Sequence, residues 1–265
     1  MVSLDPEDGT ERLQAAFPND FHPRLAGSMP RLLPILVLLA ALGFAVSPML
    51  SNGFGGYRPD QFPIPQTDPP IQPAGWAFSI WGLIFAWLVA GSGFGAWKRA
   101  ADPDWQPMRP ALLVSLVLGA FWIETAHRTP IGATVLIVAM LVPALIAFLR
   151  AGQRDAVWQV RPIALYAGWL TAATGASFGM VLGGYGILSG QWAAILCLLA
   201  VTGAALAVQA ARPGEWAYPA GVIWALVGIF VANLSPANPP VLVLSALSAL
   251  LLGWRAALSY RRNRA

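Results

Sequence analysis

The chain has 265 residues, of which 57% are hydrophobic and only 11% are charged. Soluble domains carry about 25% charged residues, so this composition excludes a water-soluble globular fold. The formal net charge is +4, but the basic residues stand in short segments between apolar runs, and we expect no nucleic-acid partner. The single cysteine, Cys197, has no second thiol with which to form an intrachain disulfide.

Eight apolar stretches are long enough to cross a bilayer as helices, which takes about 17–25 residues each. We therefore predict an all-α, polytopic transmembrane bundle with eight spans, near residues 31–50, 74–97, 110–127, 130–149, 162–183, 190–210, 216–233 and 237–257. The breaks between these spans contain glycine, proline and polar turn residues. A soluble helical bundle is excluded because the runs lack polar faces that could meet water.

The 16 lysines and arginines divide unevenly between the two sides of such a bundle. One side holds only Arg58 and Arg128, and the remaining 14 of the 16 fall on the other side: Arg12, Arg24, Arg31, Lys98, Arg99, Arg109, Arg150, Arg154, Arg161, Arg212, Arg255, Arg261, Arg262 and Arg264. The positive-inside rule then predicts that both termini are cytoplasmic. We expect a multi-pass protein of a bacterial inner membrane.

The segments outside the spans differ in character. Residues 1–29 are polar and predict a cytoplasmic arm, and residues 259–265 form a basic cytoplasmic tail. The only long outer connection, residues 51–73, contains six prolines, which deny it regular structure. Because long loops in compact proteins are commonly functional, we expect a lid over the outer mouth of the bundle. A plain connector is the alternative.

Tryptophan is abundant, with 12 residues. Five of them lie near span ends, as in an aromatic belt at the membrane surface: Trp97, Trp105, Trp158, Trp192 and Trp254. Four others lie inside spans: Trp81, Trp122, Trp169 and Trp224. If these four indoles face one another, their flat apolar rings form a slot for a flat apolar ligand. Ordinary helix packing is the alternative.

The fifth predicted span carries a row of glycines, Gly175, Gly179 and Gly183, at a spacing of four residues. Small residues at this spacing allow another helix to approach closely, so we predict a helix-packing face. The pattern leaves open whether the partner belongs to the same chain or to a second copy.

Glu124 is the only acidic residue inside a span, and His127 follows it by one turn. Ionisable groups inside a membrane are costly and often functional, so this pair is a candidate polar gate. Pairing with Arg128 at the membrane surface is the alternative. Since the chain has only two histidines, a metal site built from protein ligands is not expected. No motif with a plausible context predicts an enzyme.

Two segments carry a family resemblance. Residues 73–81, Pro-Ala-Gly-Trp-Ala-Phe-Ser-Ile-Trp, open the second span directly after the proline-rich loop. They resemble the Pro-Pro-Gly-Trp-x-Phe…Trp signature of the TspO/MBR family, which comprises tryptophan-rich sensory proteins and translocator proteins. Residues 165–174 are similar to the family's fifth-helix Pro-Tyr-x-x-Trp-x-x-Phe-Ala-Thr pattern. Leu165 replaces the proline, and Ser177 stands where the family usually has asparagine.

Typical family members have five spans with a long loop after the first, and residues 30–185 follow this plan. Residues 186–258 would then be three additional spans of a divergent, extended member. The resemblance implies a receptor or sensor that binds a flat apolar ligand, such as a porphyrin or haem-like molecule or a sterol or isoprenoid-like molecule, in a pocket under the first loop. The residues that it places there are Trp76, Phe78, Trp81, Tyr166, Trp169 and Thr174. We add Trp122 and Ser177 as candidate ligand-binding residues.

Two other functions stay open at this point. Eight spans suffice for a secondary transporter of a small apolar or amphipathic solute, and residues 73–81 are loosely echoed by residues 219–224, as inverted repeats would be. Alternatively, the glycine row of the fifth span would serve as a docking face in a homodimer or in a larger membrane complex.

Overall fold

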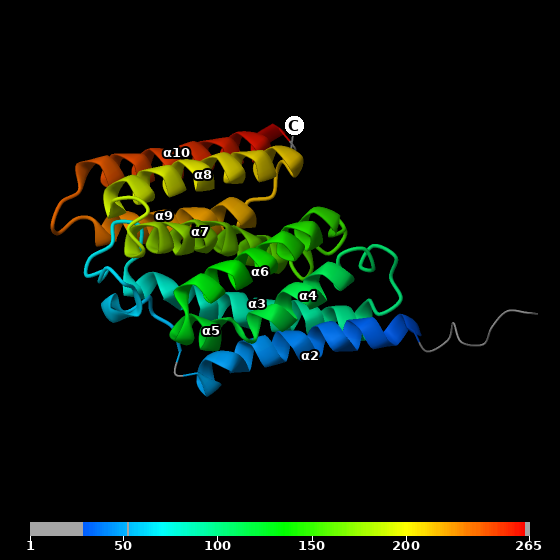
Figure 1. Cartoon of the computed structure of the whole chain (residues 1–265). Coiled ribbons are helices and arrows are strands. Elements are labelled where there is room, and N and C mark those ends of the chain that lie inside the picture. Colours follow the sequence, from blue (N-terminus) through cyan, green and yellow to red (C-terminus); the bar gives the residue numbers. More distant parts are fainter. Residues whose placement is uncertain (1–28, 52, 263–265) are drawn as a thin grey trace, which may run out of the picture.

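The computed structural model describes residues 29–51 and 53–262, so residues 1–28 of the predicted arm and residues 263–265 of the predicted tail lie outside the described residues. The regular elements follow one another as α2 (Met29–Leu50), η2 (Pro59–Gln61), η3 (Gly75–Ser79), α3 (Ile80–Lys98), α4 (Arg109–Gly119), α5 (Trp122–Arg128), α6 (Pro130–Arg150), α7 (Val160–Gly184), α8 (Gly190–Ala211), α9 (Ala217–Ala232) and α10 (Pro239–Arg262). Over the described residues the prediction of an all-α bundle is confirmed (Figure 1).

Seven helical segments of the described chain are long and apolar enough to cross a membrane. The remaining predicted span corresponds to α9, which has only 16 residues and is about 24 Å long at 1.5 Å per residue. α9 nevertheless runs beside α7 and α10, in the direction opposite to α10 (Figure 1). The third predicted span is interrupted at residues 120–121, where α4 gives way to α5.

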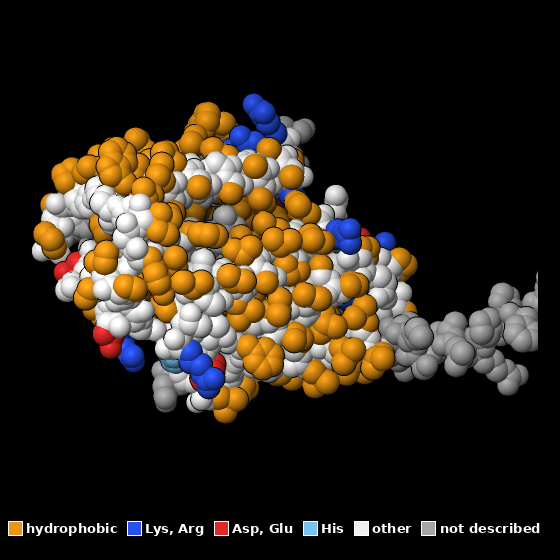
Figure 2. Space-filling view, viewed as in Figure 1, with side chains coloured by type: hydrophobic (Ala, Val, Ile, Leu, Met, Phe, Trp, Pro, Cys, Tyr) orange, Lys and Arg blue, Asp and Glu red, His pale blue; other side chains and the backbone are white. Residues whose placement is uncertain are grey.

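The bundle presents an apolar surface along its sides. Hydrophobic side chains cover the visible face of the helices, while lysine, arginine and acidic side chains gather toward the two ends (Figure 2). The described chain begins with α2 and finishes with α10 at the same end of the bundle (Figure 1). A membrane protein that crosses its bilayer an even number of times has this arrangement.

α7 is the central helix. It packs against α3, α6, α8 and α9, and it is the most buried of the candidate spans. A β-carbon on Gly168 would collide with the carbonyl oxygen of Tyr218, and one on Gly221 would lie 2.6 Å from the carbonyl oxygen of Leu165. The two helices therefore meet through their backbones, a contact that small residues make possible inside membranes.

Hydroxyl groups link α7 to its neighbours within this apolar core. Thr171 donates to the carbonyl of Ala167 at 2.8 Å, which leaves the hydroxyl of Tyr218 to donate to Thr171 at 3.0 Å. The hydroxyls of Ser115 and Tyr166 are hydrogen-bonded at 2.8 Å and join α4 to α7. Hydrogen bonds of this kind between membrane helices contribute about 0.6–2 kcal/mol each.

Arginine and tryptophan side chains organise the opposite end of the bundle from the long loop. Buried Arg109 donates to the carbonyls of Arg99 at 2.8 Å and Gly95 at 3.2 Å, which lie at the end of α3 and lack helical partners. Trp105, predicted to lie in the aromatic belt, is instead 1% exposed and donates to Asp155 at 3.0 Å. It is buried because it fills the space beside Gly95. The hydrogen bond from Arg99 to Asp155 holds the pKa of that carboxyl below its ordinary value.

The contact between α7 and α9 predicts opposite behaviour for two helical glycines. Gly168→Ala drives a methyl group into the Tyr218 carbonyl, and overpacking of this kind costs about 1–3 kcal/mol. We expect it to lower the thermal midpoint of the detergent-solubilised protein. Gly203→Ala is the control, because nothing lies within 4 Å of its added carbon, and its midpoint should stay the same or rise slightly. Equal midpoints for the two variants would contradict the close contact.

Candidate functional site

The long loop predicted over residues 51–73, of which residue 51 and residues 53–73 are described, rests on the end of α7. Its side chains Phe62 and Ile71 are buried, with 5% and 2% of their surface exposed. A β-carbon on Gly184 would collide with the ring of Phe62, and one on Gly179 would lie 2.9 Å from the side chain of Ile71. Glycines of α7 therefore leave the space in which the loop is seated.

Hydrogen bonds also hold this loop in place. They run from Gln61 Nε2 to the Ala126 carbonyl (2.8 Å), from the Ile64 N–H to the Gly184 carbonyl (2.9 Å), from Asn233 Nδ2 to the Pro70 carbonyl (2.8 Å) and from the Ala74 N–H to the Gly228 carbonyl (3.0 Å). These bonds tie the loop to α5, α7 and α9. The loop is thus packed along most of its length over the end of the bundle opposite to the described start of α2.

The predicted row of glycines on α7 finds its partners within the same chain. A β-carbon on Gly175 would collide with Val201 of α8. Gly179 lies against the loop, as described above, and a β-carbon on Gly183 would lie 3.4 Å from the Cα atom of Gly190 at the start of α8. The face considered as a docking surface for a second copy is therefore covered by α8 and the loop.

A narrow cavity of about 30 Å³ lies beneath the loop. Its lining residues come from the loop, η3, α5, α7 and α9: Phe54, Gly56, Tyr57, Gln72, Pro73, Phe78, Trp122, Trp169, Ala173, Ala176, Ser177, Met180 and Ala225. The ring of Phe54 meets those of Trp122 and Phe78 edge-on, with centroids 4.8 and 5.6 Å apart. Phe78 meets Trp169 in the same way at 5.8 Å. The pocket is aromatic, and none of its lining residues carries a charge.

Four of the eight candidate ligand-binding residues line this pocket, namely Phe78, Trp122, Trp169 and Ser177. Two of the others, Trp76 and Trp81, lie next to the pocket residues in sequence but outside the lining. Trp76 lies two residues from Phe78 on a 3₁₀ helix and therefore faces another side; it packs against Trp224 with ring centroids 5.2 Å apart. Trp81 stacks on Phe85 at 5.2 Å and meets the pocket residue Trp169 edge-on at 6.1 Å, but it does not itself line the pocket.

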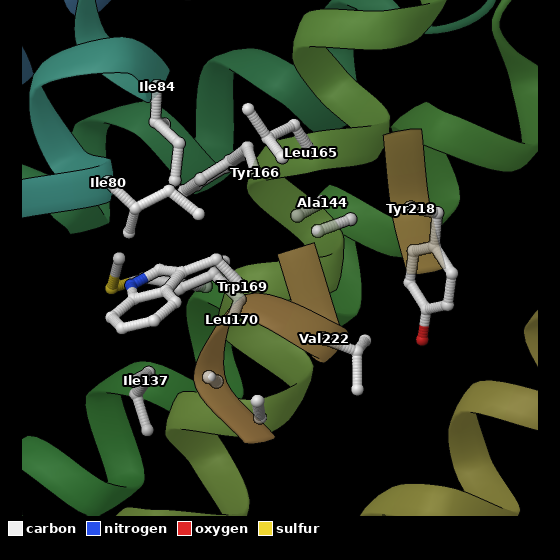
Figure 3. Close-up of a cluster of buried hydrophobic side chains, with 14 of the residues drawn as sticks. Ile80, Ile84, Ile137, Ala144, Leu165, Tyr166, Trp169, Leu170, Tyr218 and Val222 are labelled. Carbon is white, nitrogen blue, oxygen red and sulfur yellow. The ribbon is translucent and has the colours of Figure 1, made fainter. Parts of the chain in front are cut away.

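The remaining two candidates, Tyr166 and Thr174, also lie outside the lining. Tyr166 is fully buried about one turn from Trp169, in the cluster that also contains Ile80 and Ile84 (Figure 3). Thr174 lines a separate groove, together with Cys197 of α8. The four intraspan tryptophans likewise do not form a single slot, because only Trp122 and Trp169 line the pocket.

The candidate polar gate lies at the surface. Glu124 pairs with Arg128 at 2.7 Å, and their side chains are 50% and 76% exposed. His127 is exposed, with its ring centroid 6.3 Å from that of Phe54. Neither Glu124 nor His127 lines the pocket. The reason is that α5 is a separate short helix at the end of the bundle where the loop lies, and the side chains of Glu124 and His127 lie on its exposed side.

Nε1 of Trp169, in the pocket wall, has no hydrogen-bond partner among the described residues, whereas the hydroxyl of Tyr57 has that of Ser177 nearby. A buried polar group left unpaired costs about 1–3 kcal/mol. Burial raises the pKa of Tyr57 to about 12, although the nearby Ser177 hydroxyl offsets part of that shift. The phenol therefore keeps its proton at neutral pH.

The loop contributes lining residues that the sequence did not single out. Phe54 and Tyr57 close one side of the pocket, and the side chain of Gln72 accepts a hydrogen bond from the Tyr57 N–H at 3.0 Å. The available signal was the pair of aromatic residues around Gly55 and Gly56, in a loop that is otherwise rich in proline.

The contact between Phe62 of the loop and Gly184 of α7 leads to a testable prediction. In Gly184→Ala the added methyl group meets the ring of Phe62, so the loop should lift away from α7. We expect faster amide hydrogen exchange in residues 59–72 and faster cleavage there by an added protease. Gly190→Ala is the control, because its added carbon makes only an ordinary contact of 3.7 Å with Pro70. Unchanged exchange in Gly184→Ala would show that Phe62 is not seated there.

Comparison with known sequences agrees with this architecture. The sequence model of the family described as TSPO-like protein matches residues 34–258, which include α8, α9 and most of α10 as well as the segments with the family motifs. No match was found among curated proteins or among solved structures. Since the family model covers most of the chain, this membrane helix bundle belongs to the TSPO-like protein family.

Proposed function

We propose that this protein is a membrane receptor or sensor that binds a flat apolar ligand in the pocket beneath the outer loop. The observation that carries the proposal is the pocket itself, whose walls are the rings of Phe54, Phe78, Trp122 and Trp169 and whose lining has no charged residue. Aromatic walls offer large flat apolar contact areas. Porphyrin-like, sterol-like and isoprenoid-like molecules all have suitable surfaces.

The loop supplies a means by which occupancy is sensed. Phe54 and Tyr57 belong to the loop and line the pocket, while Phe62 and Ile71 anchor the same loop on α7. Because the pocket is narrow, a ring system enters only when Phe54 and its neighbours move apart. The loop then shifts relative to α7, and its outer surface changes when the ligand binds.

The charges favour one orientation in the membrane. The end with the pocket carries Arg58 and Arg128, whereas the described chain begins and finishes at the opposite end, together with most other basic residues (Figures 1 and 2). With both termini cytoplasmic, the pocket faces the outer side of a bacterial inner membrane. We propose binding and not catalysis, because the lining lacks a charged acid–base pair.

Filling the pocket provides the test. Two neutral flat probes, protoporphyrin IX dimethyl ester and the tricyclic ketone fluorenone, are titrated into the protein in mild detergent while tryptophan fluorescence is recorded. We expect saturable quenching by at least one probe. Ala176→Trp places an indole in the pocket and should weaken that binding by about tenfold or more, which corresponds to about 1.4 kcal/mol.

The matched control is Ala204→Trp, which adds the same side chain in the separate groove beside α8. It should leave the affinity unchanged. If neither probe quenches saturably above a detergent blank, or if the two variants behave alike, the proposed site is wrong.

A further inference from the structure

A second cavity lies at the end of the bundle where the loop rests. It has a volume of about 600 Å³, compared with about 30 Å³ for the pocket beneath the loop, and the two share no lining residue. Its walls come from the last part of the loop, the first turns of α8 and α10, and the connection between α9 and α10 (Figure 1). The cavity is therefore a separate site, built largely from the C-terminal helices.

The loop wall of this cavity is held from two sides. Nδ2 of Asn233, directly after α9, donates to the carbonyl of Pro70 at 2.8 Å. At the start of α8, a β-carbon on Gly190 would make an ordinary contact of 3.7 Å with the ring of Pro70. Asp68 directly precedes Pro69 and Pro70, whose rings fix their own φ angles. The backbone that carries Asp68 into the cavity wall is therefore stiff.

Asp68 lacks a counter-charge at this end of the bundle. The described acidic residues there are Asp60, Asp68 and Glu124, and the described arginines are Arg58 and Arg128. Arg58 pairs with Asp60 at 3.2 Å, and Arg128 pairs with Glu124 at 2.7 Å. No ion pair joins Asp68 to another described residue, and it is the only charged residue that lines the cavity. The cavity thus carries one uncompensated negative charge.

Gln191 supplies an unused donor in the same cavity. Its side-chain oxygen accepts a hydrogen bond from Nδ2 of Asn238 at 2.7 Å, and both residues line the cavity. The amide of Gln191 is therefore held at the wall, yet its buried Nε2 has no partner among the described residues. Since an amide nitrogen can only donate, the group that completes this wall contains an oxygen acceptor.

Trp192 gives the cavity an aromatic surface. It lies in the first turn of α8 and is 61% exposed. Tryptophans at the ends of membrane helices lie at the level of the lipid headgroups, and the face of an indole attracts organic cations. A metal ion is a poor fit, because one carboxylate supplies too few of the oxygen ligands that Ca²⁺ or Mg²⁺ requires. An anion would meet no basic side chain in the lining.

We propose that this cavity binds a small organic ammonium group with a neighbouring oxygen acceptor, as in an ethanolamine headgroup. The carboxylate of Asp68 and the indole of Trp192 receive the ammonium, and Nε2 of Gln191 donates to the oxygen. Such a group is supplied either by a phosphatidylethanolamine lipid at the membrane surface or by a soluble ethanolamine derivative. The proposal is independent of the ligand in the pocket beneath the loop.

The experiment uses the full chain in an uncharged maltoside detergent. Binding of three soluble probes is followed by saturation-transfer NMR: glycerophosphoethanolamine, its N-acetyl derivative, which lacks the ammonium, and propylamine, which lacks the oxygen. We expect saturable binding of glycerophosphoethanolamine, weaker binding of propylamine and none of the acetylated form. In a parallel arm, native mass spectrometry compares retention of phosphatidylethanolamine with retention of its N-acetylated form.

The variants address each group in turn. Asp68→Asn removes the charge at an exposed position, and we expect it to weaken binding of either ammonium compound by about two- to fivefold, the range of partly exposed ion pairs. Asp60→Asn is the matched control in the same loop, because Asp60 pairs with Arg58 and does not line the cavity. Gln191→Leu should weaken glycerophosphoethanolamine by about two- to tenfold, as for one hydrogen bond, and leave propylamine unchanged.

The two arms identify the source of the group. Binding of the lipid alone indicates a membrane headgroup, and binding of the soluble probe alone indicates a soluble compound; either supports the proposal if Asp68→Asn weakens it and Asp60→Asn does not. Equal binding of the acetylated forms, an unchanged affinity in Asp68→Asn, or no saturable binding in both arms would overturn it. Each of these results leaves the proposed function standing, because the two cavities have separate linings.

Discussion

The backbone contact between α7 and α9 is the constraint on which the rest of the structure depends. In a bilayer, lipid tails are as apolar as leucine, so helices gain little from hydrophobic burial and associate mainly through close packing and hydrogen bonds. Gly168 and Gly221 make this close packing possible, and the hydroxyl pair of Thr171 and Tyr218 adds a polar link beside it. Once α7 is held in this way, the directions of its other side chains are set.

The pocket is a consequence of how α7 is surrounded. Near its outer end, α7 carries glycines where the loop rests, and the loop side chains fill the space that larger residues would occupy. In the part of α7 that precedes these glycines, Trp169, Ala173 and Ser177 follow one another at four-residue intervals and line the pocket. Such spacing places side chains on one face of a helix. A single helix face thus supplies an aromatic wall, a small residue and a hydroxyl.

The loop is more than a cover for this face. It contributes an aromatic wall through Phe54 and a polar group through Tyr57, and it is attached to three helices by hydrogen bonds. In the proposed function, contact with a ligand and the position of the loop are therefore physically coupled. α9 also takes part, because Ala225 completes the lining. The division of the chain at residue 185 consequently does not separate a binding unit from an addition, since α9 both packs on α7 and borders the pocket.

The sequence by itself determined the apolar segments, their approximate bounds, the irregular loop and the family resemblance, because hydropathy, turn residues and short motifs act over neighbouring residues. Only the tertiary structure decided which side chains share a pocket. The 3₁₀ geometry of η3 turned Trp76 away from Phe78, and the break after α4 left Glu124 at the surface. Partners such as Gly168 and Tyr218 lie 50 residues apart in the chain. Rotation and contact of whole helices settle such pairings, and a local pattern of residue types does not contain that information.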